Sequence, residues 1–247
     1  MLAFIFGAII GSFLNVIIIR TPKNLSIITP RSHCPKCNEA LPFYLNIPII
    51  SYIFLKGKCH FCKSSISIQY FIVELLTSII FMIIFSNLPI QKALLLSFVA
   101  SLLIIISFID FKYYLIPTYL IILLYISLIP KIMLYNISIL DAIIGSLSVG
   151  LYLISCSVIV IIRKKTLSIV GLGDILLAFF IGAWLELFNG LFCLFIASII
   201  GIFFVFIKGM SKKQSLENKI PLGTCISMSF LIVIILEIYW RFNLFTF

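Results

Sequence analysis

Long apolar runs dominate the chain, and short polar segments separate them. A helix needs about 20 mainly apolar residues to cross a bilayer. Runs of this kind lie near residues 1–19, 70–88, 93–110, 115–135, 139–162, 174–188, 190–208 and 221–240. The pattern predicts an all-α polytopic membrane protein with about eight transmembrane helices. The first run has no basic segment before it and no obvious small-residue cleavage site, so we expect a retained span rather than a signal peptide.

Composition narrows the class of protein further. Hydrophobic residues make up 63% of the 247 residues and charged residues 11%, whereas soluble domains have about 45–50% apolar and about 25% charged residues. These values exclude a soluble enzyme, a disordered chain and a disulfide scaffold. The formal net charge of +10 does not indicate nucleic-acid binding, because no basic run is interleaved with aromatic residues.

The basic residues instead predict the orientation in the membrane, since lysine and arginine are enriched in cytoplasmic loops. If the N-terminus lies outside, the segments 20–69, 111–114, 163–173 and 209–220 are cytoplasmic. Together with Lys208 at a helix end, they contain 15 of the 18 basic residues. We therefore expect both termini outside, and the long polar segment 20–69 in the cytoplasm.

Four of the seven cysteines lie in this segment, as HCPKC at 33–37 and KCHFC at 58–62. Two C-x-x-C pairs with this separation are typical of a zinc ribbon, and a reducing compartment favours metal binding over disulfides. The sequence predicts a structural zinc site with the ligands Cys34, Cys37, Cys59 and Cys62. Because four sulfurs close the coordination sphere, we do not expect zinc to be the catalyst. A metal-free reduced loop and a redox pair are alternatives, and so are His33 and His60 as ligands, although we expect them outside the coordination sphere.

Two of the eight acidic residues stand out by position. Asp110 ends the third apolar run and Asp174 begins the sixth, so both lie at the predicted cytoplasmic edge on separate helices. An ionised carboxylate at such a position raises the free energy of the folded protein unless it is paired with another group, reached by water or needed for function. Close together they would share a proton, so that one activates water while the other polarises a carbonyl. The alternative is two unrelated helix-end residues. Glu74, inside the second run, is expected to face either the catalytic interior or the loop, and we expect Glu186 and Glu237 at the opposite interface.

Together these motifs resemble the bacterial type IV prepilin peptidases, a family of GxGD-type aspartic proteases. The resemblance is carried by GSFLNVIIIR at 11–20, the two cysteine pairs, NIPIISY at 46–52, YFIVELLT at 70–77, GLGD at 171–174, GAW at 182–184 and KIPLG at 219–223. It implies that Asp110 and Asp174 are the catalytic pair. The family's pattern has Asp, Lys, Phe and Pro where this chain has Thr118, Leu176, Leu222 and Thr224.

The resemblance also implies a function and a location. The substrate is expected to be a pilin or pseudopilin precursor of a type IV pilus or type II secretion system, cut on the cytoplasmic side after the glycine that ends its basic leader. The new N-terminal residue is then expected to be N-methylated with S-adenosylmethionine as the methyl donor. The implied organisation is a transmembrane helix at 1–19, a tetracysteine loop at 20–69 as the methyltransferase module, and a seven-helix peptidase domain at 70–247, in the bacterial inner membrane.

Other functions remain compatible with the residues. They are a peptidase that lacks the methyl transfer, a non-catalytic membrane scaffold with a zinc-binding loop, and a small-solute transporter that uses the aspartates as a proton relay. A transporter would place acidic residues near the middle of the bilayer, whereas Asp110 and Asp174 lie at one edge of their apolar runs. The position of the two aspartates therefore argues against the transporter.

Overall fold

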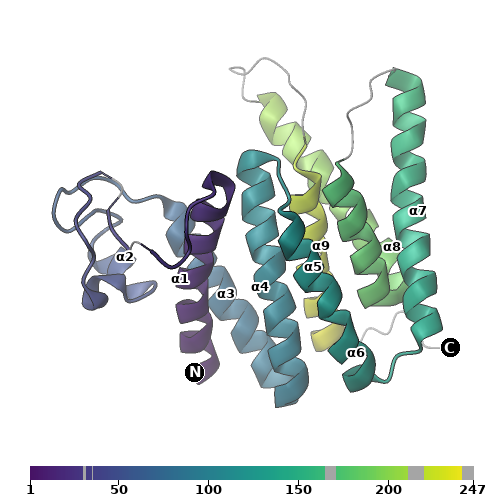
Figure 1. Ribbon diagram of the computed structural model, residues 1–247, viewed down its shortest axis with the longest axis horizontal. Coiled ribbons are helices and arrows are strands. Elements are labelled where there is room, and N and C mark those ends of the chain that lie inside the picture. Colours follow the sequence, from purple (N-terminus) through teal and green to yellow (C-terminus); the bar gives the residue numbers. More distant parts are fainter. Residues whose placement is uncertain (30–31, 35, 165–170, 211–219, 241–247) are drawn as a thin grey trace. The chain divides into compact units, whose positions relative to one another are not determined.

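The computed structural model describes residues 1–29, 32–34, 36–164, 171–210 and 220–240 (Figure 1). Its elements are α1 (Leu2–Arg20), η1 (Thr21–Lys23), η2 (Phe43–Asn46), α2 (Ile50–Phe54), α3 (Ile68–Asn87), α4 (Ile90–Tyr113), α5 (Thr118–Ile126), α6 (Leu128–Tyr135), α7 (Ile139–Lys164), α8 (Leu172–Met210) and α9 (Leu222–Trp240). Within these described residues, seven helices are long and apolar enough to cross a membrane, with α5 and α6 counted as one. The predicted all-α, polytopic architecture is confirmed.

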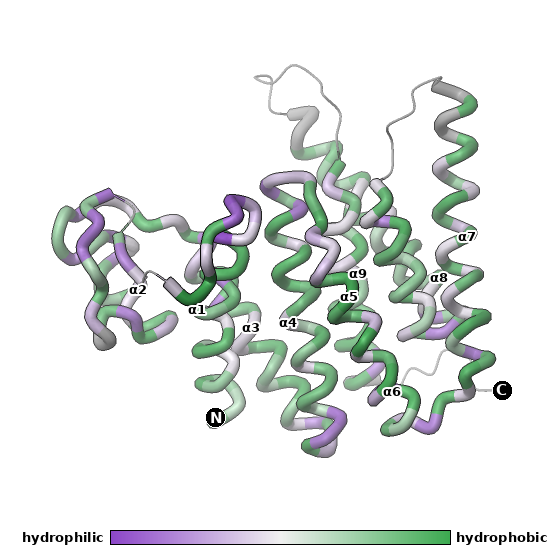
Figure 2. Tube along the Cα trace, viewed as in Figure 1, coloured by the Kyte–Doolittle hydropathy of each residue, from purple (hydrophilic) through white to green (hydrophobic). Residues whose placement is uncertain are grey.

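Hydropathy separates the long helices from the segment between α1 and α3. Figure 2 shows the helices as hydrophobic over most of their length, whereas hydrophilic and hydrophobic stretches alternate along that segment.

The span formed by α5 and α6 is interrupted because of a proline within it. Pro130 has no N–H and its ring conflicts with the carbonyl group four residues earlier, so α5 ends at Ile126 and α6 begins at Leu128. Between them, the hydroxyl of Ser127 donates to the carbonyl oxygen of Leu124 (2.5 Å).

The chain forms two compact units, Met1–Ile105 and Ile106–Phe247. The boundary between them falls inside α4. The first unit contains α1, the segment with the four cysteines and α3, and the second contains α5 to α9. The division expected from the sequence, between a tetracysteine loop at 20–69 and a peptidase domain at 70–247, concerns function and stays a prediction.

In the first unit, small residues bring α1 against α3. A Cβ atom added to Gly7 would lie 2.7 Å from the backbone of α3, and one added to Gly11 would lie 2.8 Å from Cα of Glu74. Such small residues let membrane helices approach closely. One turn further along α1, Nδ2 of Asn15 donates to the carbonyl oxygen of Tyr70 (3.1 Å). This stripe of α1 therefore holds the two helices together by close backbone packing and by side-chain hydrogen bonds from Asn15 and Ser12.

In the second unit, α8 is a hairpin of two helical arms. The chain reverses at Glu186, which has the non-helical angles φ 62° and ψ −171°. A Cβ atom added to Gly190 would lie 3.3 Å from Cα of Gly182, although residues eight apart in a straight helix are about 12 Å apart. The two arms correspond to the two spans predicted at 174–188 and 190–208. Figure 1 shows α8 next to α7, and the two helices pack against each other.

A buried lysine lies near the bend of α8, and the sequence analysis did not anticipate it. Lys131 on α6 is only 5% exposed, and its Nζ lies 5.0 Å from the centre of the Trp184 ring. Glu186 and Glu237 are close enough to interact with its charge. Nδ2 of Asn189 donates to Oε1 of Glu237 (3.0 Å). Because buried ionisable groups need partners of opposite charge, this cluster links α6, α9 and the bend of α8.

Candidate active site and metal centre

The four cysteines of the C-x-x-C pairs form one cluster in the first unit. Their sulfur atoms all lie within 4.8 Å of one another. The Cys34 and Cys62 sulfurs are 3.8 Å apart, and those of Cys37 and Cys59 are 4.0 Å apart. In a tetrahedral zinc site with zinc–sulfur bonds of about 2.3 Å, neighbouring sulfurs are about 3.8 Å apart. The cluster therefore has the composition and dimensions of a four-sulfur metal site.

Each cysteine pair lies on a tight turn, and the two turns repeat the same geometry. In the first turn, the N–H of Cys34 donates to the carbonyl oxygen of Glu39 (3.0 Å), and in the second the N–H of Cys59 donates to that of Ser64 (2.8 Å). The residue after each second cysteine, Asn38 or Lys63, has a positive φ of 59° or 56°. Each turn supplies two ligands, so a metal ion would join the two turns into one structure.

Local interactions favour the thiolate form that a metal requires at two of the four cysteines, Cys34 and Cys62. The backbone N–H of Cys37 is the main group that lowers the pKa of Cys34 to about 6. The hydroxyl of Ser64 lowers the pKa of Cys62. At Cys37 the N–H of Glu39 acts in the same direction, but burial and the neighbouring sulfurs outweigh it and raise the pKa to about 12. Four thiolates therefore repel one another in this cluster, and a divalent cation is the group that would neutralise them.

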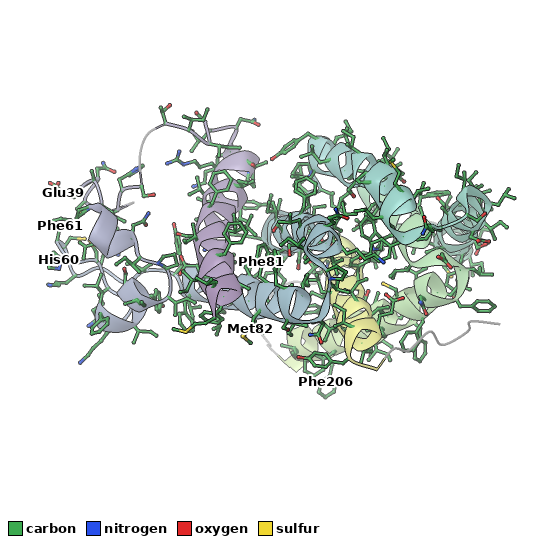
Figure 3. The ribbon with its side chains drawn as sticks, turned by 90° about the horizontal axis from the view of Figure 1, so that it is seen from below. Glu39, His60, Phe61, Phe81, Met82 and Phe206 are labelled. Carbon is green, nitrogen blue, oxygen red and sulfur yellow. The ribbon has the colours of Figure 1, made fainter. Side chains whose placement is uncertain are left out.

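The two histidines next to the cysteines do not join the cluster, as expected. Among the described residues, the group that could hold a metal contains the four cysteines and no histidine. His60 is exposed, as are its neighbour Phe61 and Glu39. Figure 3 shows these three residues on the outer edge of the loop, on the side away from α1. A closed four-sulfur site is typical of structural zinc, which needs no open coordination position.

Glu74 connects the cysteine loop to the helix pair. This residue of α3 is 7% exposed, and its Oε2 accepts a hydrogen bond from the backbone N–H of Ile49 in the loop (2.7 Å). Ile49 has φ 63° and ψ −54°, and the N–H of Ile50 donates to the carbonyl oxygen of Pro48 (2.6 Å). These features define a γ-turn of the strained, positive-φ kind. Of the two expectations for Glu74, the structure therefore supports contact with the loop.

In the second unit, Asp110 is a buried carboxylate held by the first turn of α9. It lies near the end of α4 and is 5% exposed. Its Oδ2 accepts hydrogen bonds from the backbone N–H of Thr224 (2.7 Å) and from the hydroxyl of the same residue (3.1 Å). The N–H groups of a first helical turn have no partner within the helix. This helix start is therefore suited to bind a carboxylate.

Asp174 lies in the first turn of α8 and uses its two oxygens differently. Its Oδ2 accepts a hydrogen bond from the backbone N–H of Gly171 (3.1 Å). Its Oδ1 is buried and has no hydrogen-bond partner in the part of the chain that the structure describes. Buried polar atoms are nearly always paired. The free oxygen is therefore a candidate for contact with a water molecule or a substrate.

Gly223 and Ile116 bring the two carboxylates together. Asp110 is near enough to Asp174 for their charges to interact, and the backbone of Gly223 lies close to both. A Cβ atom added to Gly223 would lie 2.6 Å from Cδ1 of Ile116 and 3.1 Å from Oδ2 of Asp110, and one added to Gly173 would lie 3.0 Å from Cβ of Ile116. The glycines therefore leave room for close contact of α8 and α9 with the end of α4 and the loop that follows it. Two carboxylates in such an arrangement can share one proton and act as an acid and a base.

All six site residues predicted from the sequence therefore lie in two clusters, the four cysteines in the first unit and the two aspartates in the second. The sequence analysis missed Gly223 and the donor role of Thr224. The sequence feature that could have indicated them is the KIPLGT segment at the start of the last apolar run. In that segment, Thr224 stood out only as a departure from the family's pattern.

Comparison with protein families gives two matches along the chain. Residues 5–88 match the Bacterial Peptidase A24 N-terminal domain, and residues 97–206 match the Type IV leader peptidase family. The four cysteines and Glu74 fall in the first match, and both aspartates fall in the second. No solved structure matches the chain.

Several curated bacterial proteins are similar to this chain, and those of Vibrio cholerae and Escherichia coli are covered over most of their length. A prepilin leader peptidase/N-methyltransferase of Vibrio cholerae is 35% identical over 93% of this chain and 93% of its own length. The type 4 prepilin-like proteins leader peptide-processing enzyme of Escherichia coli is 30% identical over 96% of this chain and 93% of its own length. A prepilin leader peptidase/N-methyltransferase of Myxococcus xanthus is 40% identical over 46% of this chain, which is 34% of that protein.

Proposed function

Because the chain belongs to the type IV prepilin leader peptidase family, we propose that it is a membrane aspartic endopeptidase that removes the basic leader of type IV prepilins or pseudopilins. Asp110 and Asp174 are the proposed catalytic pair. The observation that carries this assignment is the approach of the two carboxylates around the first turn of α9. One of them, Asp174, has a buried oxygen free for a reacting water.

The proposed reaction is hydrolysis of the peptide bond after the glycine that ends the leader. The pair carries one proton and one negative charge, because two close carboxylates do not both ionise. The ionised member removes a proton from water, whose oxygen attacks the glycine carbonyl carbon, while the protonated member gives its proton to the carbonyl oxygen. The tetrahedral intermediate then collapses: the C–N bond breaks, the leaving nitrogen takes up a proton, and the leader and a new N-terminal amine are released.

The second proposed activity is N-methylation of that amine. It is supported by the family match over residues 5–88 and by the names of the relatives in Vibrio cholerae and Myxococcus xanthus. S-adenosylmethionine is the proposed donor: its sulfonium methyl group passes to the amine nitrogen, the sulfur keeps the electrons of the broken bond, and the amine loses a proton. The proposed module is the tetracysteine loop at 20–69, and no residue is assigned to binding the donor.

Zinc is the proposed occupant of the cysteine cluster. The sulfur–sulfur distances and the charge of four thiolates fit this ion, and a closed site gives it a structural role. In a loop with only two isolated β-bridges and no named strand among its described residues, metal binding would supply much of the folding free energy. Cys34, Cys37, Cys59 and Cys62 would hold the ion.

The proposed location is the bacterial inner membrane, with the cysteine loop and the catalytic pair on the cytoplasmic side and both termini outside. The distribution of lysine and arginine supports this orientation. It is also the geometry that the reaction needs, because the leader of a membrane-anchored substrate reaches the cytoplasmic face while its apolar helix stays in the bilayer.

A cleavage assay tests the proposal. Membranes with the wild-type protein, Asp110→Asn or Asp174→Asn are mixed with a prepilin that has a basic leader and a Gly–Phe junction. Asp141→Asn is the matched control, because this exposed aspartate lies in the first turn of α7. We expect the wild type and the control to cleave, and each of the other variants to lose at least about 100-fold in rate. A methyl mass on the product amine supports the second activity. Cleavage by either active-site variant at the wild-type rate would overturn the catalytic pair, and no cleavage by intact wild-type protein would favour a scaffold.

A further inference from the structure

We propose that Thr224 is a positioning residue of the peptidase, one that pins Oδ2 of Asp110 and leaves Oδ1 of that carboxylate for proton transfer. The inference rests on the proposed peptidase function and deepens it. It is carried by the hydrogen bonds of a single residue in the first turn of α9.

The N–H of Thr224 holds the carboxylate in place. It lies 2.7 Å from Oδ2 of Asp110, which is a short distance for such a bond and typical of a charged acceptor. Thr224 is the third residue of α9, so its N–H has no partner within the helix. Because this donor belongs to the backbone of a long helix, it fixes the oxygen more firmly than a mobile side chain would.

The hydroxyl of Thr224 has two acceptors for one proton. Its Oγ1 lies 3.1 Å from Oδ2 of Asp110 and 2.9 Å from the carbonyl oxygen of Ser107. A hydroxyl carries a single donor proton that rotates to suit its surroundings. The hydroxyl therefore donates to Asp110 when that carboxylate is ionised and to Ser107 when Asp110 is protonated. The same side chain thus supports both protonation states through which a catalytic aspartate must pass.

The two aspartates are held in matching ways. Oδ2 of Asp174 accepts the N–H of Gly171 (3.1 Å), and Oδ1 of Asp174 has no partner among the described residues. In each carboxylate a backbone N–H therefore occupies one oxygen. Oδ1 of Asp174 therefore remains for water and substrate, the backbone of Gly223 lies close to both carboxylates, and Thr224 holds Oδ2 on the Asp110 side.

The test compares steady-state cleavage of a prepilin by the wild type, Thr224→Val and Thr224→Ser. Valine has the shape of threonine without the hydroxyl, and serine restores the hydroxyl. The matched control is Thr77→Val, because Thr77 is also fully buried in a membrane helix and its hydroxyl donates only to a carbonyl oxygen, that of Val73 (2.7 Å). The thermal unfolding midpoint of each variant is measured in the same detergent.

Thr224→Val is expected to lower kcat by about 10-fold or more, the effect of one hydrogen bond to a charged group, with KM unchanged. Thr224→Ser is expected to stay within about 3-fold of the wild type, and Thr77→Val to keep the wild-type kcat. The inference fails if wild type cleaves and Thr224→Val has the same kcat, if the loss appears only in KM, or if serine does not restore the rate. An inactive wild type would instead contradict the proposed function itself.

Discussion

Replacing Glu74 with alanine is expected to loosen the cysteine loop from the α1–α3 helix pair. The buried carboxylate accepts the N–H of Ile49 at 2.7 Å. A hydrogen bond to a charged group contributes about 1.5–3 kcal/mol. Ile49 is a β-branched residue at φ 63°, and backbone strain of this kind is on the order of 1–3 kcal/mol. Without Glu74 only the hydrogen bond from the N–H of Ile50 to the carbonyl oxygen of Pro48 is left among the described contacts of this turn, so we expect the turn to relax.

The expected size of this loosening follows from the free energy of the hydrogen bond between Glu74 and Ile49 alone. A loss of about 1.5–3 kcal/mol raises the equilibrium constant for local opening by about 10- to 150-fold. Amide hydrogen exchange reports this constant directly when reclosing is fast. The expected result is faster exchange by that factor in a peptide that covers residues 47–54. Glu74→Gln keeps an acceptor of the same shape without the charge, so we expect an increase of about 3- to 10-fold.

The matched control for this experiment is Glu39→Ala. Glu39 is an exposed carboxylate in the same loop, so its removal tests whether any loss of negative charge loosens the segment. We expect its exchange to match the wild type within about 2-fold, as for most exposed substitutions. Equal exchange rates in Glu74→Ala and Glu39→Ala would refute the anchoring role of Glu74.

Three further predictions follow from the same contacts. Cys34→Ser together with Cys37→Ser removes two of the four sulfurs, so metal analysis of the purified protein is expected to find zinc in the wild type and none in the variant; a wild type without zinc would contradict the metal site. Because protons compete with the metal for thiolates, a chromogenic chelator is expected to detect zinc release as the pH falls from about 7 to about 5, and release that is independent of pH would argue against thiolate ligands. Gly223→Ala places a Cβ atom 2.6 Å from Ile116 and 3.1 Å from Asp110, so at least about 10-fold of the cleavage rate is expected to be lost, while Gly201→Ala, with only Cys225 at 3.9 Å, is expected to keep the wild-type rate.

Features that depend on short-range patterns or on the bilayer were predictable from the sequence. The thickness of the bilayer sets the length of an apolar run, which explains why the spans could be recognised one by one. The two C-x-x-C pairs carry their own geometry, since each turn presents two sulfurs to one point. Asp110 and Asp174 could be expected on the same side of the membrane because Asp110 ends one span and Asp174 begins another that runs in the opposite direction. The reversal near Glu186 was predicted as a boundary between two spans, although no glycine or proline occupies that position.

Contacts between distant segments were not predictable in the same way. Thr224 and Asp110 are 114 residues apart, and the resemblance had drawn attention to residue 224 only because proline was expected there. Proline has no N–H, so a chain that followed the expected pattern could not make the contact that holds Oδ2. Likewise, nothing local to Glu74 indicates a strained turn at Ile49, and Lys131 is one polar residue in an apolar run. These partners emerge only when helices pack.

The bend at Glu186 has a consequence for the lipid around the proposed catalytic pair, Asp110 and Asp174. The first arm of α8, residues 172–185, rises about 21 Å at about 1.5 Å per residue, whereas the hydrocarbon core of a bilayer is about 30 Å thick. A span shorter than the bilayer creates a hydrophobic mismatch, and lipids respond by thinning locally. Thinning beside this arm brings bulk water towards Asp174. The bilayer thus contributes to access, and lipids with longer acyl chains are expected to slow cleavage without any change in the protein.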